Sequence, residues 1–227
     1  MNILYFLRER TKFIRWFYEV AGGPFCETIQ KIESQQPPFD ELPYREDSEP
    51  PFMAEWAEAN LGLEMLGRSC VSMLSASLQL YFTTWETELG VQWAEGERKK
   101  AFENGWIHGY RVCFGSMPNV LWDACPVKFN ILEDVTLARI SDQHPEHIAT
   151  MHVPHIKGLR HDNQSIFVSA ADRTIFSDPD LAAIPWLRPN LHVSSDTLAI
   201  AIEEVEALAS WLEERLLDVK YLGFRPS

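Results

Sequence analysis

The residues best suited to chemistry lie in one stretch late in the chain, between Arg139 and His161. Five of the seven histidines fall within residues 144–161, and three cations lie among them or just before: Arg139, Lys157 and Arg160. The formal net charge of the chain is −13, so this stretch is a local basic patch in an acidic protein. An anion is therefore expected to bind here, with His147, His152, His155, Lys157 and Arg160 as candidate binding residues.

Arg139 and His144 form the sharpest candidate pair within this stretch. They are five residues apart, and Pro145 favours a helix end between them, which lets the two side chains converge. Arginine offers a permanently charged fork for a phosphate, and histidine moves a proton near neutral pH. Such a pair can cleave RNA without a metal: Arg139 stabilises the charged phosphorane, and His144 takes the 2′-hydroxyl proton or protonates the leaving oxygen.

Two other interpretations of the histidines stay open. The spacing H-x2-H-x4-H-x2-H from His144 to His155 is compatible with a metal site, with Glu146 as a further ligand. There is no H-E-x-x-H motif, however, and two of the spacers contain proline. The simplest interpretation is a set of solvated loop histidines with no site at all. We therefore assign no metal ligand and no cofactor from the sequence.

The elements that must position these residues are mostly helices. Apolar spacing predicts helices over residues 2–20, 25–34, 53–89, 97–113, 128–142 and 196–219, with the first ended by Gly22-Gly23-Pro24. Residues 35–51 are rich in proline and acid and predict a loop. Residues 146–193 are irregular, with short strands expected at 166–168 and 191–193. In the last helix we expect one apolar face and one acidic face, the latter comprising Glu203, Glu204, Glu206, Glu213 and Glu214.

Composition bounds the class of protein. Hydrophobic residues make up 46% of the 227 residues, enough for a sizeable core. No apolar run is long enough to span a membrane, and the charges from Arg8 to Lys12 interrupt any signal-peptide core, so a cytoplasmic protein without a membrane partner is expected. The four cysteines lack CxxC spacing, and Cys70 and Cys113 lie in apolar helical patterns typical of buried thiols.

The order of these features resembles the HEPN superfamily. The resemblance rests on the small-residue helix, on the run Ile131-Leu-Glu-Asp-Val-Thr-Leu-Ala-Arg139-Ile-Ser-Asp-Gln-His144, and on Leu191-His-Val-Ser-Ser-Asp-Thr-Leu198 opening the last helix. It covers roughly residues 53–219. It implies an all-α, HEPN-like bundle of four to five helices, with a short β insertion before the last helix. The chain is then one domain over 1–227, with N-terminal helices in 1–34, a loop at 35–51 and the bundle core at 52–219.

The resemblance also implies a function. Many members are metal-independent RNases of toxin–antitoxin or defence systems, and they often dimerise with their two motifs facing one another. By resemblance, Arg139 is the phosphate ligand and His144 the acid/base. A homodimer, an RNA substrate and an antitoxin-like protein partner are then expected. Other members are inactive binding or scaffold proteins; active members usually carry a polar residue after the arginine, most often Asn, where this chain has Ile140. A hydrolase using the histidines from His144 to His161 around a metal is the second alternative.

Side chains near this site have simpler interpretations. Glu133 and Asp134 precede Arg139 and could orient it, but we expect exposed helix acids. Trp106, His108 and Tyr110 could stack on a base, but we expect a packed helix face.

Overall fold

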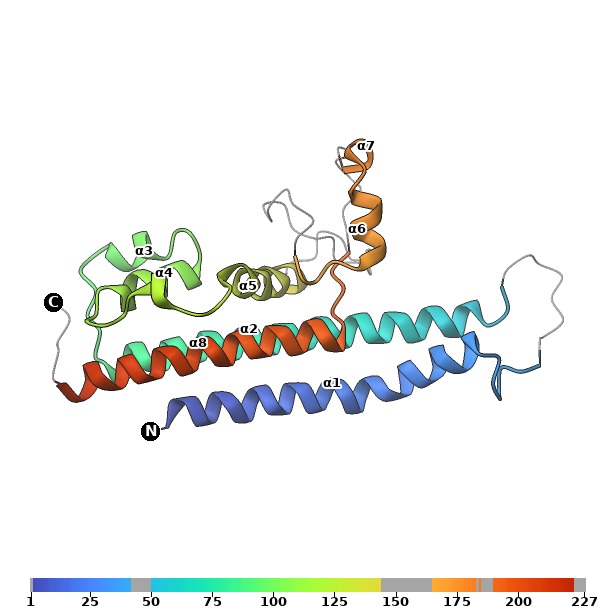
Figure 1. Ribbon diagram of the computed structural model, residues 1–227, viewed down its shortest axis with the longest axis horizontal. Coiled ribbons are helices and arrows are strands. Elements are labelled where there is room, and N and C mark those ends of the chain that lie inside the picture. Colours follow the sequence, from blue (N-terminus) through green and yellow to red (C-terminus); the bar gives the residue numbers. More distant parts are fainter. Residues whose placement is uncertain (1, 42–49, 144–164, 183, 185–189, 223–227) are drawn as a thin grey trace.

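The computed structural model describes residues 2–41, 50–143, 165–182, 184 and 190–222. Four helices form a bundle in which α2 contacts each of the others (Figure 1). The elements are α1 (Ile3–Glu33), α2 (Met53–Glu88), α3 (Glu97–Ala101), α4 (Trp106–Gly115), a 3-10 turn (Trp122–Ala124), α5 (Phe129–Gln143), α6 (Ala170–Phe176), α7 (Pro179–Ala182) and α8 (Ser195–Leu222). The all-α prediction is confirmed. Within the described ranges, none of the helices has the length and apolarity needed to cross a membrane.

Helices α2 and α8 lie side by side and form the middle layer of the molecule. In Figure 1, α1 runs along one side of this pair, and α3, α4 and α5 lie along the other. The two short helices α6 and α7 project from the same side as α5. The core fills the space between the long helices, with Leu74, Leu78, Leu132, Leu208 and Leu212 fully buried.

Helix α1 does not end at Gly22-Gly23-Pro24 as the sequence predicted. It continues to Glu33, so the predicted helices 2–20 and 25–34 are one element. Pro24 removes one backbone donor inside the helix, which by itself favours a break. Packing against α2 overrides that preference: Gly22 lies against Leu63 and Leu66, and the ring of Phe25 occupies the space beside Gly62. Tertiary contacts outweigh a local stop signal here.

Helix α2 matches the prediction of a helix over 53–89. It ends before Gly90, whose φ of +61° is a conformation that glycine adopts without strain. The small residues of α2 let other segments approach closely. At Gly67 an added Cβ would lie 2.9 Å from the backbone oxygen of Val193, so a side chain at this position would displace the backbone that enters α8.

The predicted helix over 97–113 is wrong in one respect, because it is two helices. Gly105, with a φ of +99°, separates α3 from α4. The break lets Phe102 fold back onto α4, where its ring packs edge-on against Tyr110 at 5.0 Å between centroids. Gly109 leaves the space that the Phe102 ring needs. Burial of this ring offsets the interrupted helix.

Of the short β insertion expected before the last helix, the described residues show only an isolated β-bridge position at Asn190. Phe167 and His192 do meet, and the His192 N–H donates to the Phe167 carbonyl at 2.8 Å. They form no strand pair, because Ser169 caps α6 by accepting the Asp172 N–H at 3.0 Å, so the chain turns into a helix directly after Val168. Helices α6 and α7 therefore occupy part of the region expected to be irregular.

Glu213 was expected on the exposed acidic face of the last helix, and that expectation is wrong. It is 7% exposed, and its carboxylate lies between three helices. One oxygen accepts hydrogen bonds from the Tyr81 hydroxyl (3.0 Å) and the Trp85 indole (2.9 Å). The other accepts the backbone N–H of Leu4, in the first turn of α1, at 3.4 Å. Burial and the neighbouring Glu213 raise the pKa of Tyr81 well above its ordinary value, so this phenol stays a donor.

Replacing Glu213 tests this junction. We expect Glu213→Leu to lower the free energy of unfolding by about 3–5 kcal/mol, because it leaves the Trp85 indole and the Leu4 N–H without an acceptor. The Tyr81 hydroxyl keeps only the Ala209 carbonyl, at 2.9 Å. Glu213→Gln keeps one acceptor oxygen and should cost less. The control is Glu214→Gln, whose side chain is 82% exposed, with an expected change within about 0.5 kcal/mol. Urea unfolding measures all three; equal effects of Glu213→Leu and Glu214→Gln would contradict the assignment.

Candidate functional site

Arg139 lies on the face of α5 that packs into the bundle. It follows Leu132 by seven residues and Val135 by four, and both of these are fully buried. The helical repeat therefore turns the arginine toward α2, where its Nη1 donates to the Gln79 amide oxygen at 2.8 Å. The side chain is half-buried. A cation on an inward face is costly unless it is paired, so its position indicates a role other than solvation.

Helix α2 presents a polar row to this region. Arg68, Ser72, Ser75 and Gln79 are spaced by four, three and four residues, so they share one side of the helix. Arg68 is 7% exposed and Ser75 is fully buried. Within the described residues, the Ser75 hydroxyl has no hydrogen-bond partner. This row was not predicted, although the i, i+4, i+7, i+11 spacing of polar residues inside an apolar helix indicates it.

Asp134 holds the returning chain against α5. It is 6% exposed, so the expectation of an exposed acid is wrong for Asp134, although Glu133 is exposed as expected. The Asp134 carboxylate accepts the backbone N–H of Ile166 at 3.1 Å. The chain leaves α5 at Gln143. At Ile166 it is again beside this helix, at Asp134, which lies less than three helical turns before Gln143. Asp134 therefore holds the segment at Ile166 against α5.

The other predicted site residues lie outside the described part of the chain. These are His144, His147, His152, His155, Lys157, Arg160 and the remaining histidine of the stretch, His161. The side chain of Ile140 is also outside it. The pairing of Arg139 with His144 therefore stays a prediction. Within the described residues, no group of three or more His, Cys, Asp or Glu side chains is arranged to hold a metal ion.

The chemistry available at the described part of the site is anion binding. A guanidinium carries five N–H donors in a fixed fork, and the Gln79 amide holds this fork from one edge. A fork held in this way can take two oxygens of a phosphate or carboxylate at once. Its hydrogen-bond partner on α2, Gln79, cannot itself carry charge, so the pairing orients Arg139 without neutralising it.

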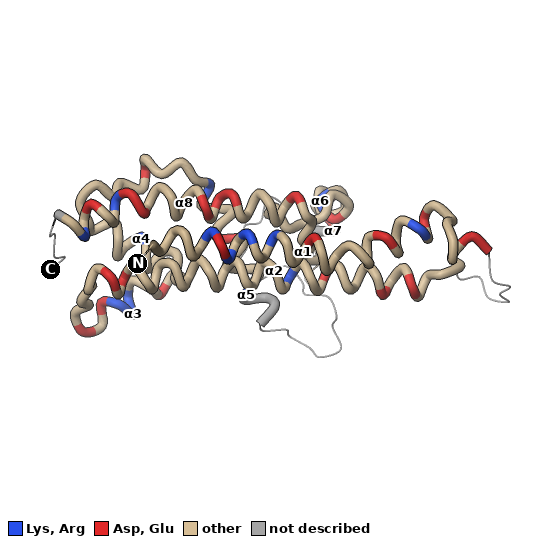
Figure 2. Tube along the Cα trace, turned by 90° about the horizontal axis from the view of Figure 1, so that it is seen from below, with Lys and Arg blue, Asp and Glu red and all other residues tan. Residues whose placement is uncertain are grey.

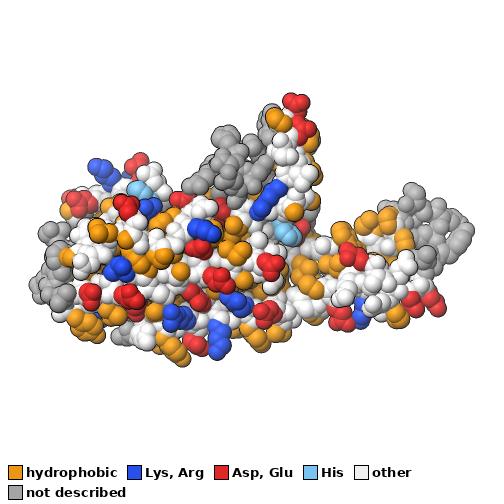
Figure 3. Space-filling view, viewed as in Figure 1, with side chains coloured by type: hydrophobic (Ala, Val, Ile, Leu, Met, Phe, Trp, Pro, Cys, Tyr) orange, Lys and Arg blue, Asp and Glu red, His pale blue; other side chains and the backbone are white. Residues whose placement is uncertain are grey.

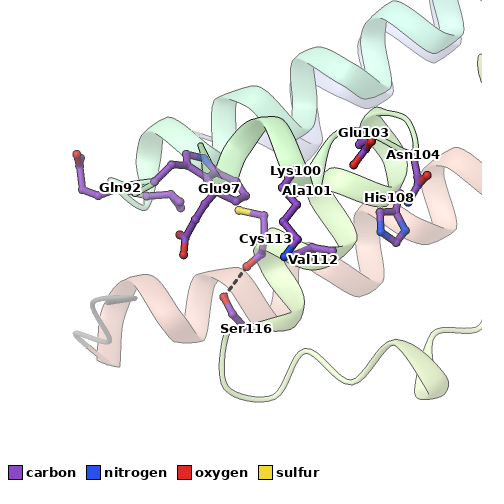
Figure 4. A pocket seen from close by; sticks show the side chains of 12 residues that line it. Gln92, Glu97, Lys100, Ala101, Glu103, Asn104, His108, Val112, Cys113 and Ser116 are labelled. Carbon is purple, nitrogen blue, oxygen red and sulfur yellow. Dashed lines mark hydrogen bonds between the residues drawn. The ribbon is translucent and has the colours of Figure 1, made fainter. Parts of the chain in front are cut away.

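A hollow lies between α3 and α4 (Figure 4). It has a volume of about 600 Å³, and both signs of charge line it. Its residues include Glu97, Lys100, Asn104, His108 and Cys113. Burial raises the pKa of Cys113 to about 12, so this thiol stays protonated and is a poor nucleophile. Burial likewise raises the pKa of Cys70 to about 12, and the prediction of buried reduced thiols at these two positions is confirmed.

The packed-face interpretation of α4 is confirmed for Trp106 and Tyr110 and is wrong for His108. Tyr110 is buried and stacks on Phe82, with ring centroids 5.0 Å apart and planes at 18°. Trp106 packs edge-on against the same Phe82 ring at 5.9 Å. His108 is exposed at the rim of the hollow. Trp106 and Tyr110 are thus both packed against Phe82.

Comparison of the chain with protein-family models, with curated proteins and with solved structures finds no match. The site is therefore interpreted from its own residues and geometry.

Ser75 provides a test of the polar row. We expect Ser75→Ala to raise the free energy of unfolding by about 1 kcal/mol, because it removes a buried hydroxyl that no described group satisfies. The control is Ser77→Ala on the same helix, whose hydroxyl donates to the Met73 carbonyl at 2.8 Å and whose removal should be neutral or slightly destabilising. Thermal unfolding of both variants measures the difference. A loss of stability in Ser75→Ala would instead indicate a partner for this hydroxyl.

A polar cluster between α2 and α4 gives a pH-dependent prediction. Partial burial raises the pKa of Glu86, but hydrogen bonds from Trp93 (2.7 Å), Arg98 (3.3 Å) and Tyr110 (2.9 Å) outweigh it and lower the pKa below its ordinary 4.5. A lowered pKa stabilises the fold above pH 4.5, and this stability is lost as pH falls through the folded-state value.

We therefore expect Glu86→Gln to destabilise the protein by about 1 kcal/mol at pH 7, and by progressively less below about pH 4. Urea unfolding at several pH values measures the difference between the variant and the wild type. The matched control is the exposed Glu214→Gln, for which no such trend is expected. A difference that stays constant from pH 7 to pH 3 would contradict the ionised role of Glu86.

Proposed function

We propose that this chain is a HEPN-like protein with a metal-independent ribonuclease centre, in which Arg139 binds phosphate and His144 moves the proton. The observation that carries the proposal is the position of Arg139 near the end of α5: a half-buried guanidinium on the inward face, oriented by Gln79. The resemblance of the sequence from Ile131 to His144 to the HEPN motif supplies the reaction class. The all-α bundle is consistent with that resemblance.

The chemistry of this pair is RNA cleavage by internal transfer. The 2′-oxygen of the ribose attacks the adjacent phosphorus, the bond from phosphorus to the 5′-oxygen breaks, and a cyclic phosphate and a 5′-hydroxyl result. Arg139 would stabilise the negative charge that develops on the phosphorane oxygens. His144 would take the 2′-hydroxyl proton or give a proton to the 5′-oxygen. Neither role needs a metal ion.

The biological setting is proposed on the same resemblance. A toxin–antitoxin or defence system would supply an RNA substrate and an antitoxin-like protein that covers the site, and the protein would act as a homodimer. The charge of −13 weakens non-specific attraction to nucleic acid, so selection of RNA would depend on the local basic stretch between Arg139 and Arg160.

The competing proposal is a HEPN-like binding or scaffold protein that has lost the chemistry. Ile140 favours it, because this position follows Arg139 directly and an aliphatic side chain cannot hydrogen-bond to a phosphate or to His144. Both proposals share the fold, and they differ in what substitution of the motif does to RNA. A metal-dependent hydrolase is third, and its histidines lie outside the described residues.

Cleavage of labelled RNA by the full chain tests the proposal. With EDTA present, we expect the wild type to cleave RNA and Arg139→Ala to be slower by about 10²–10³-fold, because it removes a transition-state charge partner. Gln79→Ala should lower the rate less, since it only loosens the fork. The control is Arg15→Ala, an exposed arginine on α1, which should keep full activity.

The same assay separates the alternatives. An inactive wild type whose Ile140→Asn variant gains EDTA-resistant cleavage supports the scaffold proposal for the natural chain. Activity that disappears in EDTA and returns with zinc supports the metal-dependent hydrolase. An active wild type with a fully active Arg139→Ala variant would overturn the assigned role of Arg139.

A further inference from the structure

Helix α1 carries an apolar stripe on its outer side. Five large side chains are each 51–56% exposed: Tyr5, Phe6, Phe13, Trp16 and Val20. At about 100° per residue these positions span an arc of about 100° around the helix. Figure 3 shows hydrophobic side chains along the edge of the molecule where Figure 1 places α1. We call these five residues the outer stripe.

The outer stripe is not the margin of the core. The buried residues of the same helix, Ile3, Leu7 and Ile14, lie on roughly the opposite side. Helix α1 is thus apolar on two sides, and only one of them is covered by α2 and α8. An exposed row of aromatic rings on a helix that already has its core contacts marks an interaction surface.

The order of residues in the outer stripe is symmetric about Phe13. Phe6 and Val20 are each seven residues away from it, on nearly the same line along the helix. In an antiparallel pair of identical helices, the residue numbers of two facing residues add up to the same value all along the interface. A sum near 26 brings Phe13 against Phe13 and Phe6 against Val20. Such self-complementarity is what a two-fold interface requires.

The charges within and beside the stripe fit the same register. Glu9 lies in the middle of the stripe, and at a sum of 25, one residue away from the register that pairs Phe13 with itself, it faces Trp16 of the second copy, whose indole N–H is a donor. Arg8 and Glu19 lie about 20° apart on one flank, so each arginine faces the glutamate of the other copy. A lipid surface would accept the rings but would bury Glu9 without a partner.

We propose that the outer stripe docks a second copy of this chain, with the two α1 helices antiparallel and Phe13 at the two-fold axis. An apolar groove of about 250 Å³ opens beside Phe6, between α1 and Leu80 of α2, and lies where Val20 of the second copy would be seated. The four half-exposed rings bury roughly 100 Å² each and Val20 buries less, so the stripe provides at most about 500 Å² per copy. That is below the roughly 800 Å² of a standard interface, so the dimer dissociates measurably on dilution.

This interface lies on the far side of the molecule from the candidate site. Helices α2 and α8 separate α1 from α5 (Figure 1). The two Arg139 side chains of such a dimer would therefore point away from each other, whereas the resemblance implies facing motifs. The inference does not rest on the proposed function, because it concerns assembly and is measured without RNA. Figure 2 shows most of the Lys and Arg residues of α1 in its N-terminal half.

Solution mass of the full chain over a dilution series is the first test. We expect the wild type to approach twice the 26.1 kDa of one chain at high concentration and to dissociate on dilution. Phe13→Glu places two carboxylates at the axis and should raise the dissociation constant at least about 30-fold. The control is Leu121→Glu, the same kind of change at a side chain that is 71% exposed elsewhere, which should leave the dimer unchanged. Circular dichroism checks that both variants remain folded.

A charge swap tests the register. Arg8→Glu and Glu19→Arg should each weaken the dimer, and the double variant should restore it, because the pair re-forms with reversed signs. Arg8 also donates to Ser210 on α8 at 3.1 Å. Loss of that contact cannot be repaired by Glu19→Arg, so recovery in the double variant reports pairing between copies.

Cross-linking distinguishes the antiparallel pair from a parallel one. In a Cys26→Ser background, Phe13→Cys should cross-link to itself with a short bis-maleimide, and Phe6→Cys should not, since the antiparallel register separates its two copies by about 21 Å along the axis. Equal cross-linking at both positions would overturn the register. A wild type that is monomeric at every concentration would overturn the proposal, as would a monomer that sediments with anionic phosphatidylserine vesicles through Phe13 and Trp16.

Discussion

The buried carboxylate of Glu213 is the interaction on which the bundle depends. It satisfies donors from α1 and α2 while belonging to α8, so it fixes three long helices at one point. A buried acid is tolerated only with such a set of donors, because desolvation of an unpaired charge is costly. The apolar packing of Leu74, Leu78, Leu208 and Leu212 would allow neighbouring registers of the helices. The directional bonds of Glu213 select one of them, and the positions of all other groups follow.

Helix α2 gives the candidate site its frame, because it is shared by both sides of the molecule. Its glycines receive Phe25 on one side and the backbone at Val193 on another, so α1 and the start of α8 approach closely. A third side carries the polar row that ends at Gln79, against Arg139 of α5. Close packing on two sides leaves α2 little freedom to rotate, and the amide of Gln79 is therefore held at a defined place for the arginine.

Arg139 and Ser75 show where the fold accepts groups that do not favour packing. A half-buried guanidinium and a buried hydroxyl without a described partner are both less stable than apolar residues of similar size. Ser75 lies one turn before Gln79, the partner of Arg139, on the same side of α2, and such departures from apolar packing are typical of sites where stability is traded for a chemical role. The outer stripe of α1 is the corresponding feature on the other side, where apolar groups remain exposed.

The sequence pattern predicted the all-α class and the extents of α2 and α5, because these follow from the 3.6-residue repeat of apolar side chains. It did not predict the continuation of α1 through Pro24, the break at Gly105, or the burial of Asp134 and Glu213. Each of these depends on a partner outside the local segment. The helix at Pro24 is held by packing against α2, and the break at Gly105 lets Phe102 pack on α4. Asp134 is bonded to Ile166, and Glu213 to Tyr81 and Trp85. Local spacing carries no information about such partners, and only tertiary packing decides whether a proline is tolerated or an acid is buried.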